Sequence, residues 1–125
     1  MKALIIEDEL PQAQQLKQFI SEIDPTIEVL QIIPSVNEAV AFLTLNEVDV
    51  IFLDIHLADG LCFEIFEKVT ITCPVIFTTA YDKYAIQAFK HNGIDYLLKP
   101  IVKAELEKSI SKFKLFTTSN IDYAF

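Results

Sequence analysis

The sequence predicts an α/β fold in which a doubly wound, five-stranded parallel sheet carries helices on both faces. Short apolar runs alternate with segments of helical periodicity along the 125-residue chain. The runs lack the in-and-out alternation of a half-exposed strand, which indicates strands that are covered on both faces. Strands of this kind that alternate with helices form a parallel sheet, and the length suits a single domain.

Five short runs rich in aliphatic and β-branched residues are the predicted strands. They are Lys2–Ile6, Ile27–Ile33, Val50–Leu53, Pro74–Thr78 and Ile94–Leu98. The third run is apolar at every position, so we expect it to be covered by helices on both of its faces.

Helices are predicted between these strands and after the last one. Their ranges are Leu10–Ile23, a helix that begins after Ser35, Leu61–Val69, Asp82–Asn92, and Val102 to about Phe116. Ser35 followed by Glu38 has the spacing of a capping box, which satisfies free amides of the first helical turn. Gly93 follows the fourth helix and is predicted to be its C-cap. The residues from Asp54 to Gly60 are expected to form a loop.

Composition limits the classes of partner. The chain has 18 acidic and 10 basic residues, a formal net charge of −8, and every basic residue is lysine. The absence of arginine argues against direct nucleic-acid binding by this segment. Cys62 and Cys73 lie outside any metal-ligand or redox spacing and are expected to be reduced thiols. With neither a signal-peptide layout nor a membrane-length apolar run, the sequence predicts a cytoplasmic protein with no membrane partner.

Charged and hydroxyl-bearing residues stand at the carboxyl ends of the predicted strands, where sheets of this kind bind ligands. Glu7 and Asp8 follow the first strand, Asp54 the third, Thr79 the fourth and Lys99 the fifth. Carboxylates in one small space repel one another and raise their pKa values unless a cation lies among them. Oxygen ligands suit Mg²⁺. We therefore expect a Mg²⁺ site at this edge of the sheet.

The same residues fit phosphoryl transfer. A carboxylate held between a metal ion, an amine and a hydroxyl is prepared to attack phosphorus, which makes Asp54 the candidate nucleophile. Lys99 and Thr79 would bind the equatorial oxygens of the group in transfer. Thr78 is a competing hydroxyl, but the alternation of side chains along a strand favours Thr79.

Four motifs at these strand ends resemble the response-regulator receiver domain of bacterial two-component signalling. They are Glu7–Asp8, Leu53–Asp54, Thr79–Ala80 and Tyr96–Pro100. The resemblance covers residues 1–116 as the receiver domain, and 117–125 would be a C-terminal tail or the start of a linker to a missing output domain. Phe77–Asp82 and Asp95–Pro100 are most similar to receivers of the LytTR (LytR/AlgR-like) class, which a DNA-binding domain usually follows. The fold implied is the flavodoxin-like (CheY-like) sheet with strand order 2-1-3-4-5 and five helices.

The resemblance implies a role for each residue at the strand ends. Asp54 would be the phosphoacceptor. Glu7, Asp8, Asp54 and the backbone carbonyl of His56 would hold Mg²⁺. Lys99 would pair with the phosphoryl oxygens, and its bond to the following proline would be cis.

Further roles follow from the same resemblance. Thr79 and Tyr96 would be the switch pair, in which the hydroxyl turns to the phosphoryl group and the aromatic ring moves inward. His56 and Tyr81 are expected to limit attack by water and so to set the phosphate lifetime, although they could equally be rim residues without kinetic effect. The loop after the phosphoacceptor is shorter than the common family form and has Ala58 where a proline is usual.

Partners are also implied by the resemblance. A sensor histidine kinase would supply the phosphoryl group, and phosphorylation would shift an existing equilibrium between inactive and active conformations. The output would be transcription, with DNA bound by the following domain. A homodimer would form through the face of the fourth helix, fifth strand and fifth helix. That face carries Tyr84, Ala85, Ala88, His91, Tyr96 and Lys103.

Alternatives to a phospho-accepting switch remain open. An aspartyl-phosphate phosphohydrolase is an enzyme with the same nucleophile, but in one large family its general acid is an Asp two residues later, where this chain has His56. A flavodoxin-type binding module would need a phosphate-cradling loop after the first strand, where this chain has acids. A degenerate receiver would be a phosphate-independent binding module, against which the intact acids and Lys99 argue. The sequence thus favours a signalling domain that assists only its own phosphorylation and dephosphorylation.

Overall fold

The computed structural model describes the backbone of residues 1–123 and the side chains of residues 1–115. Its main sheet has five parallel strands in the order β2-β1-β3-β6-β7. The strands and helices have the following bounds: β1 Lys2–Ile6, α1 Leu10–Ile23, β2 Glu28–Ile33, α2 Val36–Leu45, β3 Val50–Asp54, β4 His56–Leu57, β5 Gly60–Leu61, α3 Phe63–Lys68, β6 Val75–Thr79, α4 Ala85–Phe89, β7 Gly93–Leu98 and α5 Lys103–Tyr123. The predicted fold class and the strand order 2-1-3-4-5 are confirmed.

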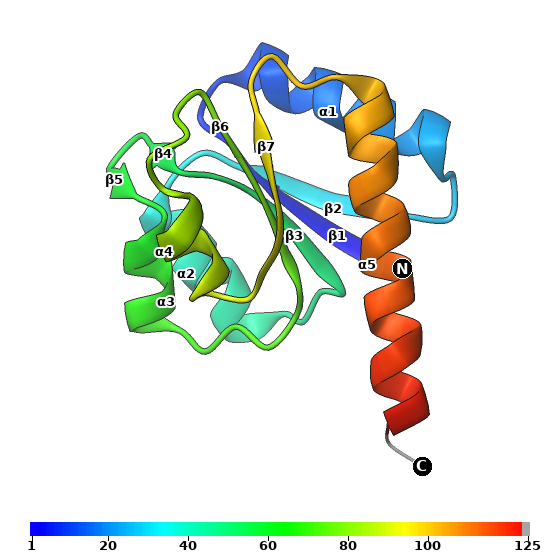
Figure 1. Ribbon diagram of the computed structural model, residues 1–125. Coiled ribbons are helices and arrows are strands. Elements are labelled where there is room, and N and C mark those ends of the chain that lie inside the picture. Colours follow the sequence, from blue (N-terminus) through cyan, green and yellow to red (C-terminus); the bar gives the residue numbers. More distant parts are fainter. Residues whose placement is uncertain (124–125) are drawn as a thin grey trace.

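Helices cover both faces of the sheet, as Figure 1 shows. One apolar layer packs α2, α3 and α4 against the sheet, and the other packs α1 and α5 against the opposite face. The inner strands β3 and β6 are buried at all five of their positions. Burial on both faces explains why these strands are apolar almost throughout. The polar exceptions, Asp54, Thr78 and Thr79, come at the carboxyl ends of the two strands.

The predicted capping of α2 is confirmed, and the predicted loop after Asp54 is not. Ser35 is the N-cap, and its hydroxyl accepts a hydrogen bond from the Glu38 amide at 3.1 Å. The segment from Asp54 to Gly60 contains β4, which pairs with β5 in a small antiparallel hairpin. Gly60 has a φ of 151°, a conformation that an L-residue rarely adopts. The short loop of the sequence therefore forms a hairpin with a tight turn.

Gly93 is not a helix C-cap. The helix α4 ends at Phe89, and the positive φ of 63° belongs to Asn92, while Gly93 is the first residue of β7. A Cβ atom on Gly93 would lie 2.7 Å from the Ala88 carbonyl oxygen and 3.0 Å from Cε2 of Phe77. The glycine is therefore needed for the close approach of α4 to the sheet.

The last helix continues beyond its predicted end near Phe116. It runs from Lys103 to Tyr123, so the polar stretch 117–120, which the sequence suggested as a tail or linker, has helical backbone. Figure 1 shows the end of α5 extending past the sheet. Residues 124–125 of the predicted tail lie outside the described residues. Within the part of the chain that the structure describes, no helix is long and apolar enough to cross a membrane.

Substitutions at Gly93 test whether this residue serves packing or capping. If Gly93 serves packing, any side chain there is overpacked, and Gly93→Ala and Gly93→Asn should each lower the free energy of unfolding by about 1–3 kcal/mol. The loss for asparagine should be at least as large as the loss for alanine. A C-cap glycine would instead tolerate asparagine better, because asparagine readily adopts positive φ. Urea unfolding checks the order of the two variants. Asn92→Gly is the control and should cost only about 1 kcal/mol, from the lost side-chain hydrogen bond to the Ile71 carbonyl.

Candidate functional site

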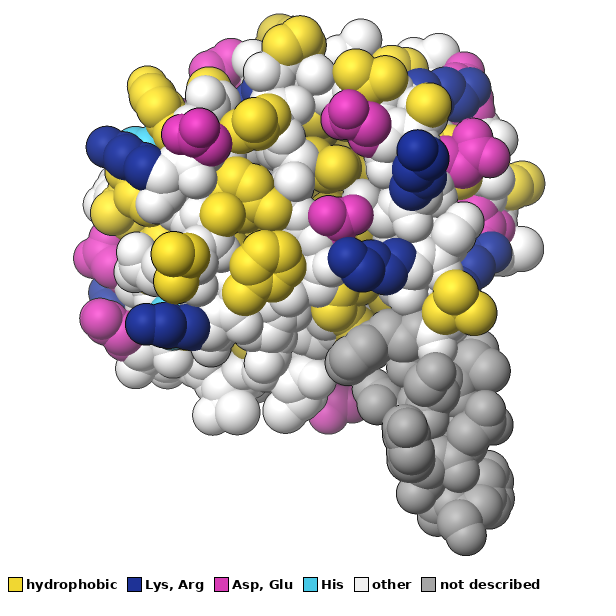
Figure 2. Space-filling view, in the orientation of Figure 1, with side chains coloured by type: hydrophobic (Ala, Val, Ile, Leu, Met, Phe, Trp, Pro, Cys, Tyr) yellow, Lys and Arg dark blue, Asp and Glu magenta, His cyan; other side chains and the backbone are white. Residues whose placement is uncertain are grey.

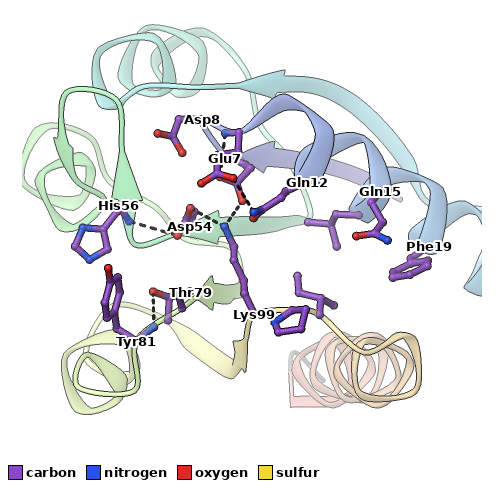
Figure 3. Close-up of a pocket in the computed structure, with 15 residues that line it drawn as sticks. Glu7, Asp8, Gln12, Gln15, Phe19, Asp54, His56, Thr79, Tyr81 and Lys99 are labelled. Carbon is purple, nitrogen blue, oxygen red and sulfur yellow. Dashed lines mark hydrogen bonds and ion pairs between the residues drawn. The ribbon is translucent and has the colours of Figure 1, made fainter.

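The carboxyl ends of the strands open into a cavity of about 640 Å³. Glu7 and Asp8 follow β1, Asp54 ends β3, Thr79 ends β6, and Lys99 follows β7. All five of these residues line the cavity, as Figure 3 shows. The parallel sheet brings them together because the carboxyl ends of its strands share one edge. The structure thus gathers the residues that the sequence placed at the strand ends.

Three carboxylates form the acidic part of the cavity. Glu7 and Asp54 are almost fully buried, at 4% and 6% exposure, and Asp8 is exposed. Each offers an oxygen, and these three oxygens lie within 4.8 Å of one another. Burial and the neighbouring Asp54 raise the pKa of Glu7. Burial and the neighbouring Glu7 likewise raise the pKa of Asp8. The folded chain therefore holds these acids at a cost in electrostatic energy.

Lys99 partly neutralises this cluster. Its ammonium nitrogen forms ion pairs with Glu7 and with Asp54, the latter at 2.9 Å from Oδ2. Burial alone would lower the pKa of Lys99, but the two carboxylates outweigh this effect and raise it. The lysine is therefore charged at neutral pH. The peptide bond between Lys99 and Pro100 is cis, as expected from the sequence.

The donor set of the cluster fits a hard divalent cation. Glu7, Asp8 and Asp54 offer only oxygen ligands, which Mg²⁺ prefers. The ammonium group of Lys99 pairs with two of the three acids. With all three acids ionised, the group keeps an excess of two negative charges, which a divalent ion would balance. The backbone of His56 adjoins this group, since its amide donates to Asp54 Oδ1 at 3.4 Å.

Of the two threonines at the end of β6, Thr79 is the one that lines the cavity. Thr78 is in register with Asp54 across the β3–β6 pair. Both threonines are buried. The Thr79 hydroxyl oxygen accepts a hydrogen bond from the Tyr81 amide at 3.3 Å. The alternation of side chains along the strand predicted that Thr79, rather than Thr78, faces the cavity, and the structure agrees.

Tyr96 lies outside the cavity lining, on β7. Its hydroxyl donates a hydrogen bond to the backbone carbonyl of Tyr81. Because the Tyr81 amide donates to Thr79, the Tyr81 peptide groups connect the two residues that the sequence paired as a switch. Sequence reasoning missed this connection, because no side-chain pattern signals a main-chain contact.

Aromatic rings form one wall of the cavity. The rings of His56 and Tyr81 meet edge to face with centroids 4.9 Å apart. Figure 3 shows both on the same side of Asp54. Tyr84 packs behind this wall and outside the cavity lining, with its ring centre 5.4 Å from that of His56 and 5.1 Å from the Lys83 ammonium. The sequence predicted both residues of this wall and placed Tyr84 on the dimer face.

The cavity also extends along α1, away from the acids. Gln12, Gln15 and Phe19 line this extension from α1, and Ile101 lines it from the segment after β7. None of these four residues belongs to a sequence motif. The buried residue Leu16 of α1 also lines the cavity.

Five of the six residues predicted for the dimer face reach the surface: Lys103 is exposed, and Tyr84, Ala85, His91 and Tyr96 are half-buried. Ala88 is fully buried and cannot belong to a surface. His91 lies in the turn after α4, with its ring 4.6 Å from that of Phe66. The exposed apolar residues near this face are Ile86 and Phe89 on α4, Leu98 at the end of β7, and Val102 just before α5. Figure 2 shows hydrophobic side chains gathered over α4 and β7.

Both cysteines are free thiols, as expected. Burial raises the pKa of Cys73 to about 11. Burial and the charge of Asp54 raise the pKa of Cys62 further. Both side chains are therefore protonated at neutral pH and are poor nucleophiles.

Comparisons with known proteins match one family. Residues 3–111 fit the family model described as the response regulator receiver domain. The chain is 34% identical over 125 residues to the sensory transduction protein LytT of Bacillus anthracis, covering 98% of this chain and 50% of that protein. It is 37% identical over 117 residues to the transcriptional regulatory protein LytR of Staphylococcus aureus strain N315, covering 91% of this chain and 47% of that protein. The chain thus spans about half the length of these relatives.

Solved structures agree with the sequence comparison. The response regulatory domain of protein mrkE from Klebsiella pneumoniae superposes with a TM-score of 0.78 at 30% sequence identity. The match covers 95% of this chain and 97% of that one. The resemblance to the LytR-like receivers that the sequence motifs suggested is confirmed.

Replacing Lys99 by methionine should destabilise the protein at pH 7 in the presence of EDTA. Breaking a buried ion pair leaves uncompensated charge and costs about 3–5 kcal/mol. The loss of Lys99 also removes a group that lowers the pKa of Glu7. A carboxyl whose folded pKa is raised stabilises the protein below the unfolded value of about 4.5, and this stabilisation disappears as the pH rises through the folded pKa. The deficit of the variant should therefore grow from pH 4 to pH 7, as measured by urea unfolding.

Two further variants control this measurement. Asp54→Asn in the Lys99→Met background removes one unpaired charge and should restore part of the stability. Lys103→Met breaks an exposed ion pair with Glu22 and should change the stability far less. Equal losses for Lys99→Met and Lys103→Met would contradict the central electrostatic role of Lys99.

Proposed function

The chain belongs to the response regulator receiver domain family, and we propose that it accepts a phosphoryl group on Asp54 with Mg²⁺ bound beside it. One observation carries the proposal. Asp54 Oδ2 lies 2.9 Å from the Lys99 ammonium, and Glu7 and Asp8 offer oxygens within 4.8 Å. This combination of nucleophile, fixed cation and oxygen ligands is what phosphoryl transfer requires.

The side chains divide the work of the transfer. A carboxylate oxygen of Asp54 attacks phosphorus as the bond from phosphorus to the donor breaks, and the donor leaves with the bonding electrons. The Lys99 ammonium and the Thr79 hydroxyl donate hydrogen bonds to the phosphoryl oxygens as their charge is redistributed. Glu7, Asp8, Asp54 and the His56 backbone carbonyl would hold Mg²⁺. When bound, the ion neutralises negative charge on the phosphoryl oxygens.

The switch follows from the hydrogen bonds of Thr79. In the present structure its hydroxyl oxygen accepts from the Tyr81 amide. A Thr79 hydroxyl that turns to the phosphoryl group weakens that contact and frees the segment after β6. Because the Tyr96 hydroxyl is bonded to the Tyr81 carbonyl, the position of the Tyr96 ring changes with this segment. Phosphorylation thereby shifts the balance between two conformations of one fold.

The partners are proposed from the family and from its named relatives. A sensor histidine kinase supplies the phosphoryl group. The relatives LytT and LytR are about twice as long as this chain, and LytR is named a transcriptional regulator. We therefore propose that the domain controls a following LytTR output domain that binds DNA. A second copy binds at the α4–β7–α5 face through the exposed side chains of Ile86, Phe89 and Leu98.

A small phosphodonor tests the acceptor directly. Incubation with acetyl phosphate and Mg²⁺ should add one phosphoryl group to the intact mass, with release of acetate. Asp54→Asn should give no adduct, and EDTA should abolish the adduct of the unchanged protein. Asp82→Asn, which alters an exposed acid outside the cluster, should still be phosphorylated.

Other outcomes separate the alternatives. An adduct that persists in Asp54→Asn would place the acceptor elsewhere. The absence of an adduct in the unchanged protein would favour a degenerate receiver that signals without phosphate. Continuous release of inorganic phosphate from many phosphomonoesters would favour a phosphohydrolase.

The aromatic wall is proposed to set the lifetime of the phosphoryl group. His56 and Tyr81 line the cavity beside Asp54, where their rings exclude attacking water. Replacing both by alanine should speed the loss of phosphate from Asp54 by about tenfold, the effect of roughly 1.4 kcal/mol on a barrier. Decay of the phosphorylated mass after removal of the donor measures this rate. Tyr84→Ala, which removes a ring outside the cavity lining, should change this decay rate less than the double substitution does.

A further inference from the structure

The turn between β4 and β5 is fastened to the first turn of α2. The Asp59 carboxylate accepts hydrogen bonds from two backbone amides of that helix, Val36 at 2.7 Å and Asn37 at 3.0 Å. The Ala58 amide adds a third bond, to the Pro34 carbonyl at 3.3 Å. These contacts join segments that are more than twenty residues apart in the sequence. The positive end of the helix dipole adds to the attraction for the carboxylate.

The other end of the same hairpin adjoins the phosphoacceptor. The His56 amide, at the start of β4, donates to Asp54 Oδ1 at 3.4 Å. The Ile55 amide donates to the Thr78 carbonyl, and the Cys62 amide donates to the Ile55 carbonyl at 2.8 Å, which closes the base of the hairpin. The hairpin is therefore a short rigid arm between Asp54 and α2.

We propose that Asp59 is a positioning residue, which anchors the hairpin on α2 and so holds the His56 backbone where the metal site needs it. This inference rests on the proposed function, in which the His56 carbonyl is a ligand of Mg²⁺. When the hairpin is anchored, the His56 carbonyl already lies in position before Mg²⁺ binds. Without its anchor the hairpin samples other positions. The fraction of molecules in which it is correctly placed then sets the apparent affinity for Mg²⁺.

Asp59 is not the only residue that caps α2. The Ser35 hydroxyl accepts from the Glu38 amide, while Asp59 accepts from the two preceding amides. The two side chains thus cap the same helical turn, but only Asp59 comes from the hairpin. Removal of either one should weaken α2 to a similar extent. Only the removal of Asp59 disconnects α2 from the phosphoacceptor, which provides a matched pair of variants.

Coupling between the two ends of the arm works in both directions. If the anchor at α2 improves Mg²⁺ binding, then Mg²⁺ binding must strengthen the anchor by the same factor. The amides of Val36 and Asn37 should therefore exchange their hydrogens more slowly when the metal is bound. This readout lies away from the metal site and does not depend on phosphorylation.

The experiment is a titration of the intact ¹⁵N-labelled chain with MgCl₂, followed through its amide resonances. Asp59→Ala should raise the Mg²⁺ dissociation constant by about 3–10-fold, corresponding to a competent fraction of roughly 0.1–0.3. Asp59→Asn keeps one acceptor oxygen and should give an intermediate value. Ser35→Ala should stay within about twofold of the unchanged protein, because the arm is intact. Hydrogen exchange at Val36 and Asn37 should slow with Mg²⁺ in Ser35→Ala and show no such response in Asp59→Ala.

The outcomes distinguish this inference from the proposed function. Normal Mg²⁺ binding by Asp59→Ala, or equal weakening by Ser35→Ala, would overturn the positioning role and leave the metal site standing. Failure of the unchanged protein to bind Mg²⁺ would overturn the proposed metal site, and the role of Asp59 would fall with it.

Discussion

The ion pairs of Lys99 with Glu7 and Asp54 are the interaction on which the rest of the site depends. The parallel sheet forces acids from β1 and β3 into contact, because the two strands are neighbours and end at the same edge. Lys99 follows β7, two strands away from β3, and its side chain reaches across β6 to the acids. Both acids are almost fully buried, and the contact with Lys99 offsets part of the cost of their desolvation. With all three acids ionised, the cluster of Glu7, Asp8 and Asp54 still has two negative charges more than Lys99 balances.

Two main-chain routes lead outward from this charged centre. One starts at Thr79 and passes through the Tyr81 peptide groups to Tyr96 on β7. The other passes through the β4–β5 hairpin to the first turn of α2. Both routes begin at residues that line the cavity, Thr79 and His56. A change of charge at Asp54 therefore has a physical path to the first turn of α2 and to Tyr96 on β7.

The sequence was sufficient for the fold class and for the residues gathered at the site. Apolar strands and helical periodicity are local signals, and the rule that ligands bind at the carboxyl ends of strands needs only the strand boundaries. Features set by contacts between distant segments could not be predicted. Gly93 follows a helical segment as a C-cap glycine would, but glycine is needed there because the residue lies close to Ala88 and Phe77. Asp59 has the signature of a turn residue, and its bonds to α2 depend on how two loops pack together.

If Asp54 accepts a phosphoryl group, as we propose, the balance of charge in the cavity favours a divalent cation bound beside it. Among the described residues that line it, Lys99 is the one lysine, against the acids Glu7, Asp8, Glu9 and Asp54. Two unit charges of the same sign at 4 Å repel by about 4 kcal/mol at a protein surface. A phosphoryl group carrying nearly two negative charges would meet several such repulsions and a single compensating lysine. Under the proposed function, the acidic cluster therefore opposes phosphorylation unless a divalent cation binds together with the phosphoryl group.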